Sequence, residues 1–206
     1  MSDKEKLILV DCDGVLLNWN YAFSTWIESH GYSKKVEDAG LHYYFEQIYD
    51  ISAEEGMRYV RMFNESVSIG FLPPQRDAMQ WVEHLHTDHG YRFHVISSMS
   101  RDPEVGRLRT KNLKKLFGES TFADFTYLDI HESKADALKQ YEGSGLWWVE
   151  DLPKHAQNGI DLGLNGVLIE HGYNMGVPDI PKYKNWKELS LDIIDAKKRR
   201  ERKEEA

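Results

Sequence analysis

The stretch LILVDCDGVLLNW, residues 7–19, ends a run of four aliphatic residues with two aspartates. Leu7 to Val10 have the length and apolar character of a buried strand, so Asp11 and Asp13 are predicted to follow its carboxyl end. Successive residues of a strand point to opposite faces, so both carboxylates can face one pocket while Cys12 faces the other way. The pattern therefore indicates a polar site where this strand ends.

Four further apolar runs have the length of strands and alternate with helical patterns. They are residues 91–96, 125–128, 146–149 and 167–169. One helix is predicted between Asp102, whose side chain can cap it, and Gly118, where it ends. Another helix precedes the second strand and carries the apolar face Ala78, Trp81, Val82 and Leu85. This alternation predicts an α/β fold with a Rossmann-like parallel sheet covered on both faces.

The segment 18–72 interrupts the alternation, because it shows helical patterns and no strand. An apolar stripe at helical spacing lies near its start and consists of Ala22, Phe23, Trp26 and Ile27. The sequence SAEE at 52–55 is a capping box and predicts the start of a later helix. We expect a core formed by residues 1–17 and 73–206, with residues 18–72 inserted as a small helical cap.

Composition narrows the class of protein. The 206 residues suit one large domain, or a core with a small insert. A formal net charge of −8 argues against general binding of nucleic acids or anionic membranes, which requires a basic surface. Cys12 is the one cysteine, and the N-terminal apolar run is too short for a signal peptide. No apolar stretch approaches the roughly 20 residues of a membrane span. We therefore expect a cytoplasmic protein.

Polar side chains also follow the other predicted strands. They are Ser97 and Ser98 after the second strand, Lys134 at the start of the helix after the third, and Glu150 and Asp151 after the fourth. Ligands of open α/β sheets bind at the carboxyl ends of the strands. We expect these side chains to gather around Asp11 and Asp13.

Four converging carboxylates would repel one another unless a cation held them together. Oxygen ligands without a histidine or thiol favour a hard ion, and Mg²⁺ suits carboxylates, waters and a phosphate. The four acids carry a charge of −4, against which Mg²⁺ and Lys134 supply +3. A phosphate dianion would be repelled without both cations. Positioning groups and stabilising charge are what phosphoryl transfer requires of a protein.

With these four motifs in order, most of the chain resembles the phosphohydrolases of the haloacid dehalogenase (HAD) superfamily. The motifs are DCDGV, FHVIS ending in Ser97, Lys134, and WWVED ending in Glu150 and Asp151. The resemblance implies that Asp11 is the nucleophile that becomes an aspartyl-phosphate. It implies that Asp13 protonates the leaving oxygen and then activates water.

The same resemblance assigns the ligands. It implies that Asp11, the backbone carbonyl of Asp13 and Asp151 bind Mg²⁺, while Glu150 acts through a water. Asp13 favours hydrolysis of a phosphate ester, because dehalogenases of the superfamily lack this aspartate and transport ATPases carry a threonine there. An insert between the first two motifs is the usual cap over the substrate. The implied function is that of a Mg²⁺-dependent phosphatase for a small phosphorylated metabolite.

The cap suggests a nucleoside 5′-monophosphate as substrate, because its aromatic residues could stack on a base. The candidates are Trp19, Tyr43 and Tyr44, although the stripe that begins at Trp19 is more typical of a cap core. The layout also resembles the 5′(3′)-deoxyribonucleotidase branch, through FLPP, the short gap from Lys134 to the acid pair, and EHGYN after the last strand. Alternatives are a phosphatase for sugar phosphates or phosphoglycolate-like acids, a phosphotransferase, or a non-catalytic binding domain.

Other readings of single motifs are weaker. Of the two serines, Ser97 is favoured over Ser98 for binding phosphate, but a one-residue shift of the strand end would exchange them. The histidines at 84, 86 and 89 suggest a zinc site, yet His84 and His86 fall on different faces of one helix. We expect them to be solvated.

Overall fold

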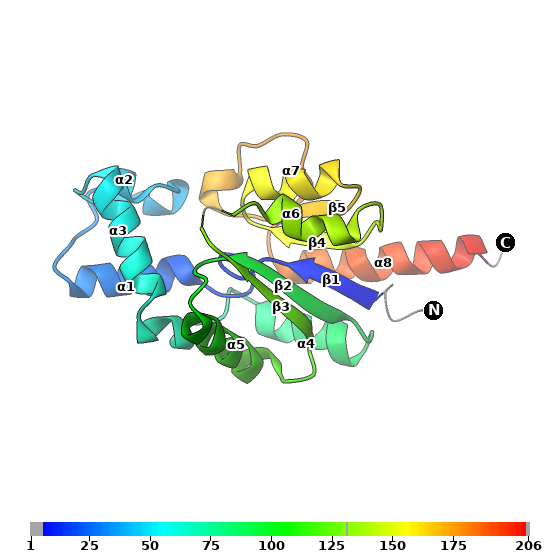
Figure 1. Ribbon diagram of the computed structural model, residues 1–206. Helices are drawn as coiled ribbons and strands as arrows, with labels where there is room; N and C mark the ends of the chain where they lie inside the picture. The colour runs from blue at the N-terminus through cyan, green and yellow to red at the C-terminus, as the bar shows by residue number, and fades with distance from the viewer. Residues whose placement is uncertain (1–5, 131, 205–206) are drawn as a thin grey trace.

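The computed structural model describes residues 6–130 and 132–204. Its elements alternate along most of the chain (Figure 1). The strands are β1 (Leu7–Val10), β2 (Arg92–Ser98), β3 (Phe122–Leu128), β4 (Trp147–Glu150), β5 (Asn165–Ile169) and β6 (Lys182–Tyr183). The α-helices are α1 (Trp19–Ser29), α2 (Phe45–Ile48), α3 (Ala53–Asn64), α4 (Ala78–Thr87), α5 (Pro103–Phe117), α6 (Lys134–Leu138), α7 (Pro153–Asp161) and α8 (Trp186–Glu204). Short 3₁₀ helices are η2 (Ala39–Leu41), η3 (Val67–Phe71), η4 (Lys139–Tyr141) and η5 (Gly172–Asn174).

The strands form one sheet in the order β3-β2-β1-β4-β5-β6. Every pairing is parallel, which confirms the predicted α/β class with a Rossmann-like sheet. From β1 the chain runs outward through β2 to β3 at one edge of the sheet, and it then crosses to β4 on the other side of β1. The strand order therefore reverses beside β1, and ligands of such sheets bind at this position.

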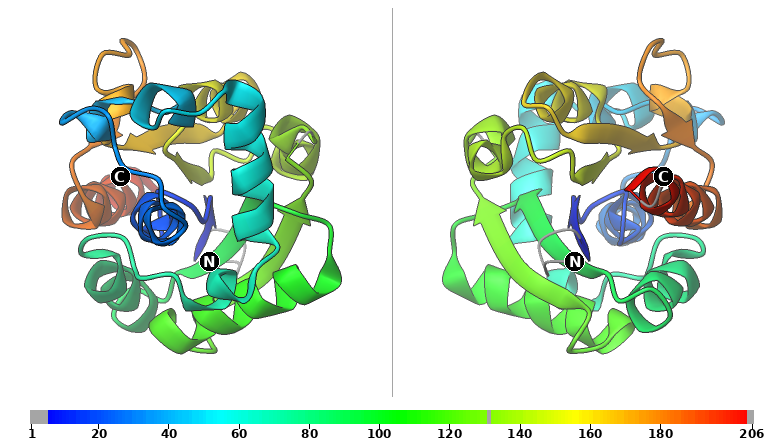
Figure 2. Two further views of the ribbon diagram at one scale, coloured as in Figure 1. Left: turned by 90° about the vertical axis from the view of Figure 1, so that its left-hand side faces the viewer. Right: turned by 90° about the vertical axis from the view of Figure 1, so that its right-hand side faces the viewer.

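Helices cover both faces of the sheet (Figure 2). α6 and α7 pack over β2, β4 and β5 on one face, while α4, α5 and α8 pack together on the other. Each face has its own buried cluster because strand residues alternate: Ile8 and Val10 belong to the cluster under α4, α5 and α8, and Leu9 belongs to the opposite cluster. This packing fixes the carboxyl ends of β1 and β4 next to each other.

Local signals set the bounds of α5. Asp102 accepts a hydrogen bond from the backbone of Glu104 at 2.8 Å, and Pro103 occupies the first helical position. Gly118 ends the helix with a positive φ of 95°, a backbone conformation that favours glycine. The predicted start and end of this helix are both confirmed.

Between β1 and α4 the chain forms α1, η2, α2, α3 and η3, which lie to one side of the sheet (Figure 1). The predicted capping box is present, because Ser52 and Glu55 bond each other's backbone N–H at the start of α3. The two ends of this segment lie side by side, because the amide of Asn18 donates a hydrogen bond to the carbonyl of Pro73 at 2.8 Å. This pairing lies close to the expected domain bounds of 18 and 72, which stay a prediction.

Some strand bounds differ from the expected ones. β2 extends to Ser98 and β3 begins at Phe122, so both are longer than the apolar runs that predicted them. β6 was not predicted, because Lys182 and Tyr183 are too few to show a periodic pattern. No helix within the described residues is long and apolar enough to cross a membrane.

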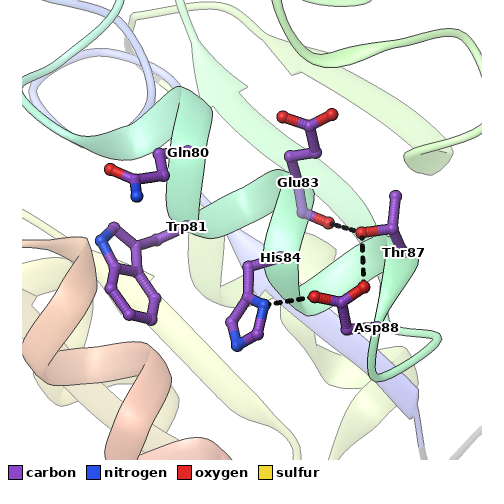
Figure 3. Close-up of a pocket in the computed structure, with 6 residues that line it drawn as sticks. All are labelled: Gln80, Trp81, Glu83, His84, Thr87 and Asp88. Atoms are coloured by element: carbon purple, nitrogen blue, oxygen red, sulfur yellow. Dashed lines mark hydrogen bonds and ion pairs between the residues drawn. The ribbon is translucent and has the colours of Figure 1, made fainter.

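The histidines of α4 do not form a metal cluster. His84 Nδ1 lies 2.6 Å from Asp88 Oδ2, in a surface pocket of about 290 Å³ (Figure 3). His86 Nδ1 instead lies 2.8 Å from the carbonyl of Tyr91, and its Nε2 lies 2.9 Å from Ser120 Oγ. The two rings therefore contact different neighbours and do not face each other.

Candidate active site

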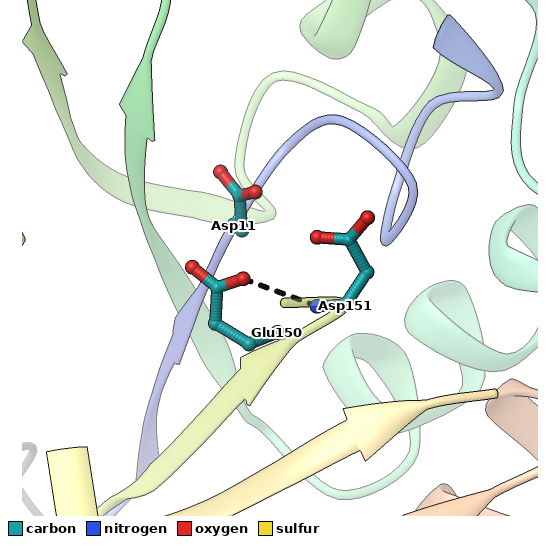
Figure 4. Close-up of side chains that lie close together, drawn as sticks. All are labelled: Asp11, Glu150 and Asp151. Carbon is teal, nitrogen blue, oxygen red and sulfur yellow. Dashed lines mark hydrogen bonds between the residues drawn. The ribbon is translucent and has the colours of Figure 1, made fainter. Parts of the chain in front are cut away.

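Three carboxylates meet where β1 and β4 end, and we call Asp11, Glu150 and Asp151 the acidic cluster (Figure 4). β1 pairs with β4, and the amide of Asp11 donates to the carbonyl of Val149 at 2.9 Å. The register places the ends of both strands side by side. One oxygen from each acid lies within 4.8 Å of the others, and all three residues are buried.

Lys134 lies beside the acidic cluster, where the sequence analysis expected it to gather with the acids. α6 carries it over the sheet, where its side chain is 3% exposed. Its Nζ lies 2.6 Å from Glu150 Oε1 and 3.0 Å from Asp11 Oδ1, and 5.7 Å from the ring of Trp148. Burial disfavours the charged form of Lys134 and would lower its pKa. The nearby Asp11 and Glu150 carboxylates have the larger combined effect and raise the pKa of Lys134. Lys134 is therefore a fixed positive charge beside the acidic cluster.

Both oxygens of Glu150 already have protein partners. Oε1 accepts from Lys134, while Oε2 accepts from the backbone amides of Asp151 at 3.1 Å and Leu152 at 3.2 Å. Burial raises the pKa of Glu150 to about 7, although Lys134 opposes the rise. These contacts favour a role for Glu150 in holding Lys134 and the turn after β4.

The cluster fits a hard divalent cation. Burial, followed by the charges of Glu150 and Asp11, raises the pKa of Asp151 well above its usual value. Asp11 Oδ1 is buried and accepts no hydrogen bond from the described residues, although Lys134 lies near it as an ion pair. Buried carboxylates this close are stable together only if a cation joins them or protons neutralise them. Oxygen ligands of this kind suit Mg²⁺.

The position of the Asp13 carboxylate differs from the prediction that four carboxylates converge. Its side chain is not part of the acidic cluster and forms an ion pair with Arg109 Nη1. Burial raises the pKa of Asp13, and Arg109 opposes the rise. The predicted charge balance therefore changes: the four acids carry −4, Lys134 and Arg109 supply +2, and a divalent cation cancels the rest. The expected use of the Asp13 carbonyl as a metal ligand stays a prediction.

Arg109 was missed in the sequence because arginine is expected to be solvated. α5 places it inward, where it is completely buried and lies 3.1 Å from Cys12 Sγ through Nη1. A signal was available: Arg109 is four residues after the buried Val105 and four before the buried Leu113. A charged residue on the apolar face of a helix predicts a buried partner.

A cavity of about 430 Å³ lies between the acidic cluster and the helical segment. The site residues of the core that line it are Asp11, Asp13, Ser97, Ser98, Lys134 and Asp151. Ser97 and Ser98 are the last two residues of β2, and Ser98 Oγ is buried without a hydrogen-bond partner among the described atoms. The structure thus brings both serines to the cavity.

The helical segment supplies the opposite wall of the cavity. Trp19 lies there but is only 8% exposed, donates to Asn64 Oδ1 at 2.8 Å and stacks on Phe23 at 4.8 Å. It is mainly a core residue, as the stripe suggested. Tyr43 and Tyr44 are 46% and 59% exposed and line the cavity. Both rings are exposed enough to contact a ligand in the cavity.

The loop after β5, residues 170–174, completes the site. Tyr173 donates a hydrogen bond to Asp151 Oδ2. Burial and the Asp151 charge raise the pKa of Tyr173, so the phenol keeps its proton. Asn174 Nδ2 donates to the carbonyl of Asp151 at 2.8 Å, and His171 Nε2 lies 2.7 Å from the carbonyl of Gly14. In the sequence, EHGYN suggested only a family branch, because nothing local shows that it folds back onto two strand ends.

Several solved structures share the fold of this chain. A haloacid dehalogenase-like hydrolase of Streptococcus pneumoniae matches with a TM-score of 0.60 and 14% identity, over 95% of this chain and 99% of that one. CbbY of Rhodobacter sphaeroides, in complex with phosphate, matches with a TM-score of 0.56 and 16% identity, over 91% and 99%. The chain has the haloacid dehalogenase fold.

Fold alone does not fix the reaction. The L-2-haloacid dehalogenase of Xanthobacter autotrophicus, with chloropropionic acid covalently bound, also matches at a TM-score of 0.50 and 11% identity, over 80% of this chain and 77% of that one. No protein-family model matches the sequence. An uncharacterised 32.4 kDa protein of Enterobacteria phage T4 is 22% identical over 162 residues. The match covers 75% of this chain and 57% of the phage protein, so the chain spans little more than half of that relative.

Proposed function

We propose that the protein is a Mg²⁺-dependent phosphatase that hydrolyses a small phosphate monoester through an aspartyl-phosphate on Asp11. The observation that carries the proposal is the position of Asp11, which lies 3.0 Å from the Lys134 ammonium, belongs to the acidic cluster and lines the cavity. A nucleophilic carboxylate beside a fixed cation, a cation site and two serine hydroxyls is the arrangement that phosphoryl transfer needs.

The protein groups would act in two steps. In the first, an Asp11 oxygen bonds to phosphorus while the bond from phosphorus to the leaving oxygen breaks, and Asp13 gives that oxygen its proton. In the second, Asp13 takes a proton from water, whose oxygen attacks phosphorus and releases the Asp11 carboxylate and inorganic phosphate. Lys134 and the serine hydroxyls hold the phosphate oxygens. Asp11 and Asp151 would hold Mg²⁺, whose charge would let a phosphate dianion approach the two carboxylates.

Arg109 supports the separate role of Asp13 in this scheme. By pairing with Asp13, it keeps that carboxylate apart from the acidic cluster, although both line one cavity. A proton-transfer group must exchange its proton during each cycle, which a metal ligand cannot do freely. The geometry therefore favours Asp13 as acid and base and Asp151 as ligand.

For the substrate we propose a nucleoside 5′-monophosphate. The cavity volume of about 430 Å³ falls within the range of small-molecule sites. Tyr43 and Tyr44 line the cavity from the helical segment, and stacking of an aromatic ring on a base is worth about 1–3 kcal/mol per base. A sugar phosphate would use hydrogen bonds in place of these rings.

Hydrolysis of a chromogenic aryl phosphate tests the chemistry. We expect activity that requires Mg²⁺ and disappears in Asp11→Asn, while the surface variant Asp88→Asn keeps it. Asp13→Asn should lose about 10² to 10⁴ in rate and accumulate phosphoenzyme. Activity of Asp11→Asn within tenfold of the wild type would overturn the covalent mechanism.

Substrate choice needs its own experiment. We expect kcat/KM for deoxynucleoside and ribonucleoside monophosphates to exceed that for sugar phosphates, and Tyr43→Ala and Tyr44→Ala to lower the nucleotide value selectively. Sugar phosphates preferred by more than tenfold would refute the nucleotide assignment and leave the phosphatase chemistry in place.

A further inference from the structure

The loop of residues 170–174 contacts both the acidic cluster and the helical segment. On one side, the Tyr173 hydroxyl donates to Asp151 Oδ2. On the other, the Tyr173 ring lies 5.5 Å from the ring of Tyr43, at an interplanar angle of 63°. One side chain thus joins a candidate metal ligand to the wall that closes over the substrate cavity.

The loop is held firmly against the core. Asn174 is completely buried, and its side chain bonds the carbonyls of Asp151 and Ile169 at 2.8 and 2.9 Å. The His171 ring stacks on Tyr173 with centroids 5.0 Å apart and an interplanar angle of 4°, while its Nε2 contacts Gly14. These contacts anchor the residues on either side of Tyr173 to the core, while the Tyr173 ring itself also contacts the helical segment through Tyr43.

The helical segment approaches the same loop closely. η2 and η5 pack together, and a Cβ on Gly172 would lie 2.4 Å from the carbonyl oxygen of Gly40. Only glycine permits this approach without displacing the backbone. Residues 39–43 are therefore docked on the loop at two points, through Gly172 and through the Tyr173 ring.

The contact with Asp151 selects one orientation of its carboxylate. Oδ2 bonds the Tyr173 hydroxyl and lies 2.4 Å from the position that a Cβ on Gly14 would take, so it is packed between the two. In Figure 4 one oxygen of Asp151 points toward Asp11 and the other points away. Holding Oδ2 in place keeps the other oxygen available to a cation.

We propose that Tyr173 is a positioning residue that couples docking of residues 39–43 to metal binding by Asp151. With the segment docked, the Tyr43 ring confines the Tyr173 ring, and the hydroxyl holds Asp151 ready for the ion. Coupling of this kind is reciprocal: if docking strengthens Mg²⁺ binding, then Mg²⁺ strengthens docking by the same factor. The inference rests on the Mg²⁺ site of the proposed function.

The first test is Mg²⁺ binding by calorimetry, which needs no substrate. We expect Tyr173→Phe to bind Mg²⁺ about tenfold more weakly, the size typical of a lost hydrogen bond to a metal ligand. Tyr32→Phe is the matched control, because it removes a hydroxyl contact to Tyr59 within the helical segment. Tyr43→Leu should weaken binding by a smaller factor, whereas Tyr21→Leu, at a ring that is 63% exposed, should not.

The second test is amide exchange of residues 39–43 with and without Mg²⁺. We expect Mg²⁺ to slow the amide exchange of residues 39–43 in the wild type. In Tyr173→Phe we expect Mg²⁺ to leave this exchange unchanged. Equal Mg²⁺ affinity in Tyr173→Phe and the wild type, or unchanged slowing by Mg²⁺ in that variant, would overturn the coupling and leave the proposed function intact. A wild type that binds no Mg²⁺ would overturn both.

Discussion

Removing divalent cations should make the stability of the protein depend on pH in a way that the acidic cluster dictates. In the metal-free protein, burial raises the pKa of Glu150 from 4.5 to about 7. Between these values the folded protein binds more protons than the unfolded chain, so its free energy of unfolding falls as the pH rises. The difference corresponds to about 3 kcal/mol for Glu150, which is completely buried. The raised pKa of Asp151 acts in the same direction.

Three histidines oppose this trend at acidic pH. Burial lowers the pKa of His94, His155 and His171, and a lowered histidine pKa makes stability rise with pH up to about 6.5. A stability curve in chelator alone would mix the two effects. Comparing the protein with and without Mg²⁺ at each pH largely cancels the histidine contribution.

The assay is therefore denaturant unfolding at pH 5, 6, 7 and 8, in chelator and in saturating Mg²⁺. We expect the stabilisation by Mg²⁺ to grow by about 3 kcal/mol from pH 5 to pH 8, because protons compete with the ion at low pH. In a chain of this length the change is about 2–4 °C in Tm per kcal/mol. Glu150→Gln should show a much smaller dependence. Stabilisation by Mg²⁺ that is equal at pH 5 and pH 8 would refute the electrostatic account of the cluster.

Three substitutions test other contacts. In denaturant titrations, Arg109→Met should lower the free energy of unfolding by about 2–3 kcal/mol. The loss is smaller than for a fully buried ion pair because Asp13 is partly exposed. Arg109→Lys should restore part of the lost stability. Lys134→Met should lower kcat/KM by about 10²–10³, while Lys114→Met on the solvated face of α5 leaves it unchanged. Gly14→Ala should weaken Mg²⁺ binding in calorimetry, since φ is +74° and the new Cβ would press on the acidic cluster.

The fold was predictable because its signals are local. The apolar run before Asp11 is long enough to mark β1, and the cap at Asp102 and the glycine at 118 mark α5 without reference to the rest of the chain. Parallel pairing then follows from the alternation of strands and helices. β6 escaped prediction for the same reason, since two residues carry no pattern and pair only because β5 offers an edge.

The candidate site was predictable only in part. Residues at strand ends could be identified, because the sheet brings those ends together whatever the helices do. Arg109 and Tyr173 could not, since each reaches the site from an element whose position depends on packing: α5 against the sheet, and the loop after β5 against Asp151. Arg109 changes the charge balance expected around Asp13, and Tyr173 fixes the orientation of Asp151, although both acids were identified from the sequence.

Those two residues also explain why acids so close together have different electrostatic surroundings. Arg109 neutralises Asp13 from within the core, so Asp13 need not be held by a cation from solvent. Among the described residues, Asp151 forms no ion pair of its own: Tyr173 donates a hydrogen bond to it but carries no charge, and Lys134 is shared by Asp11 and Glu150. The charge that remains lies on the acidic cluster, and a divalent ion is the species that balances it. The positions of Lys134 and Arg109 therefore give Asp13 and the acidic cluster different electrostatic surroundings.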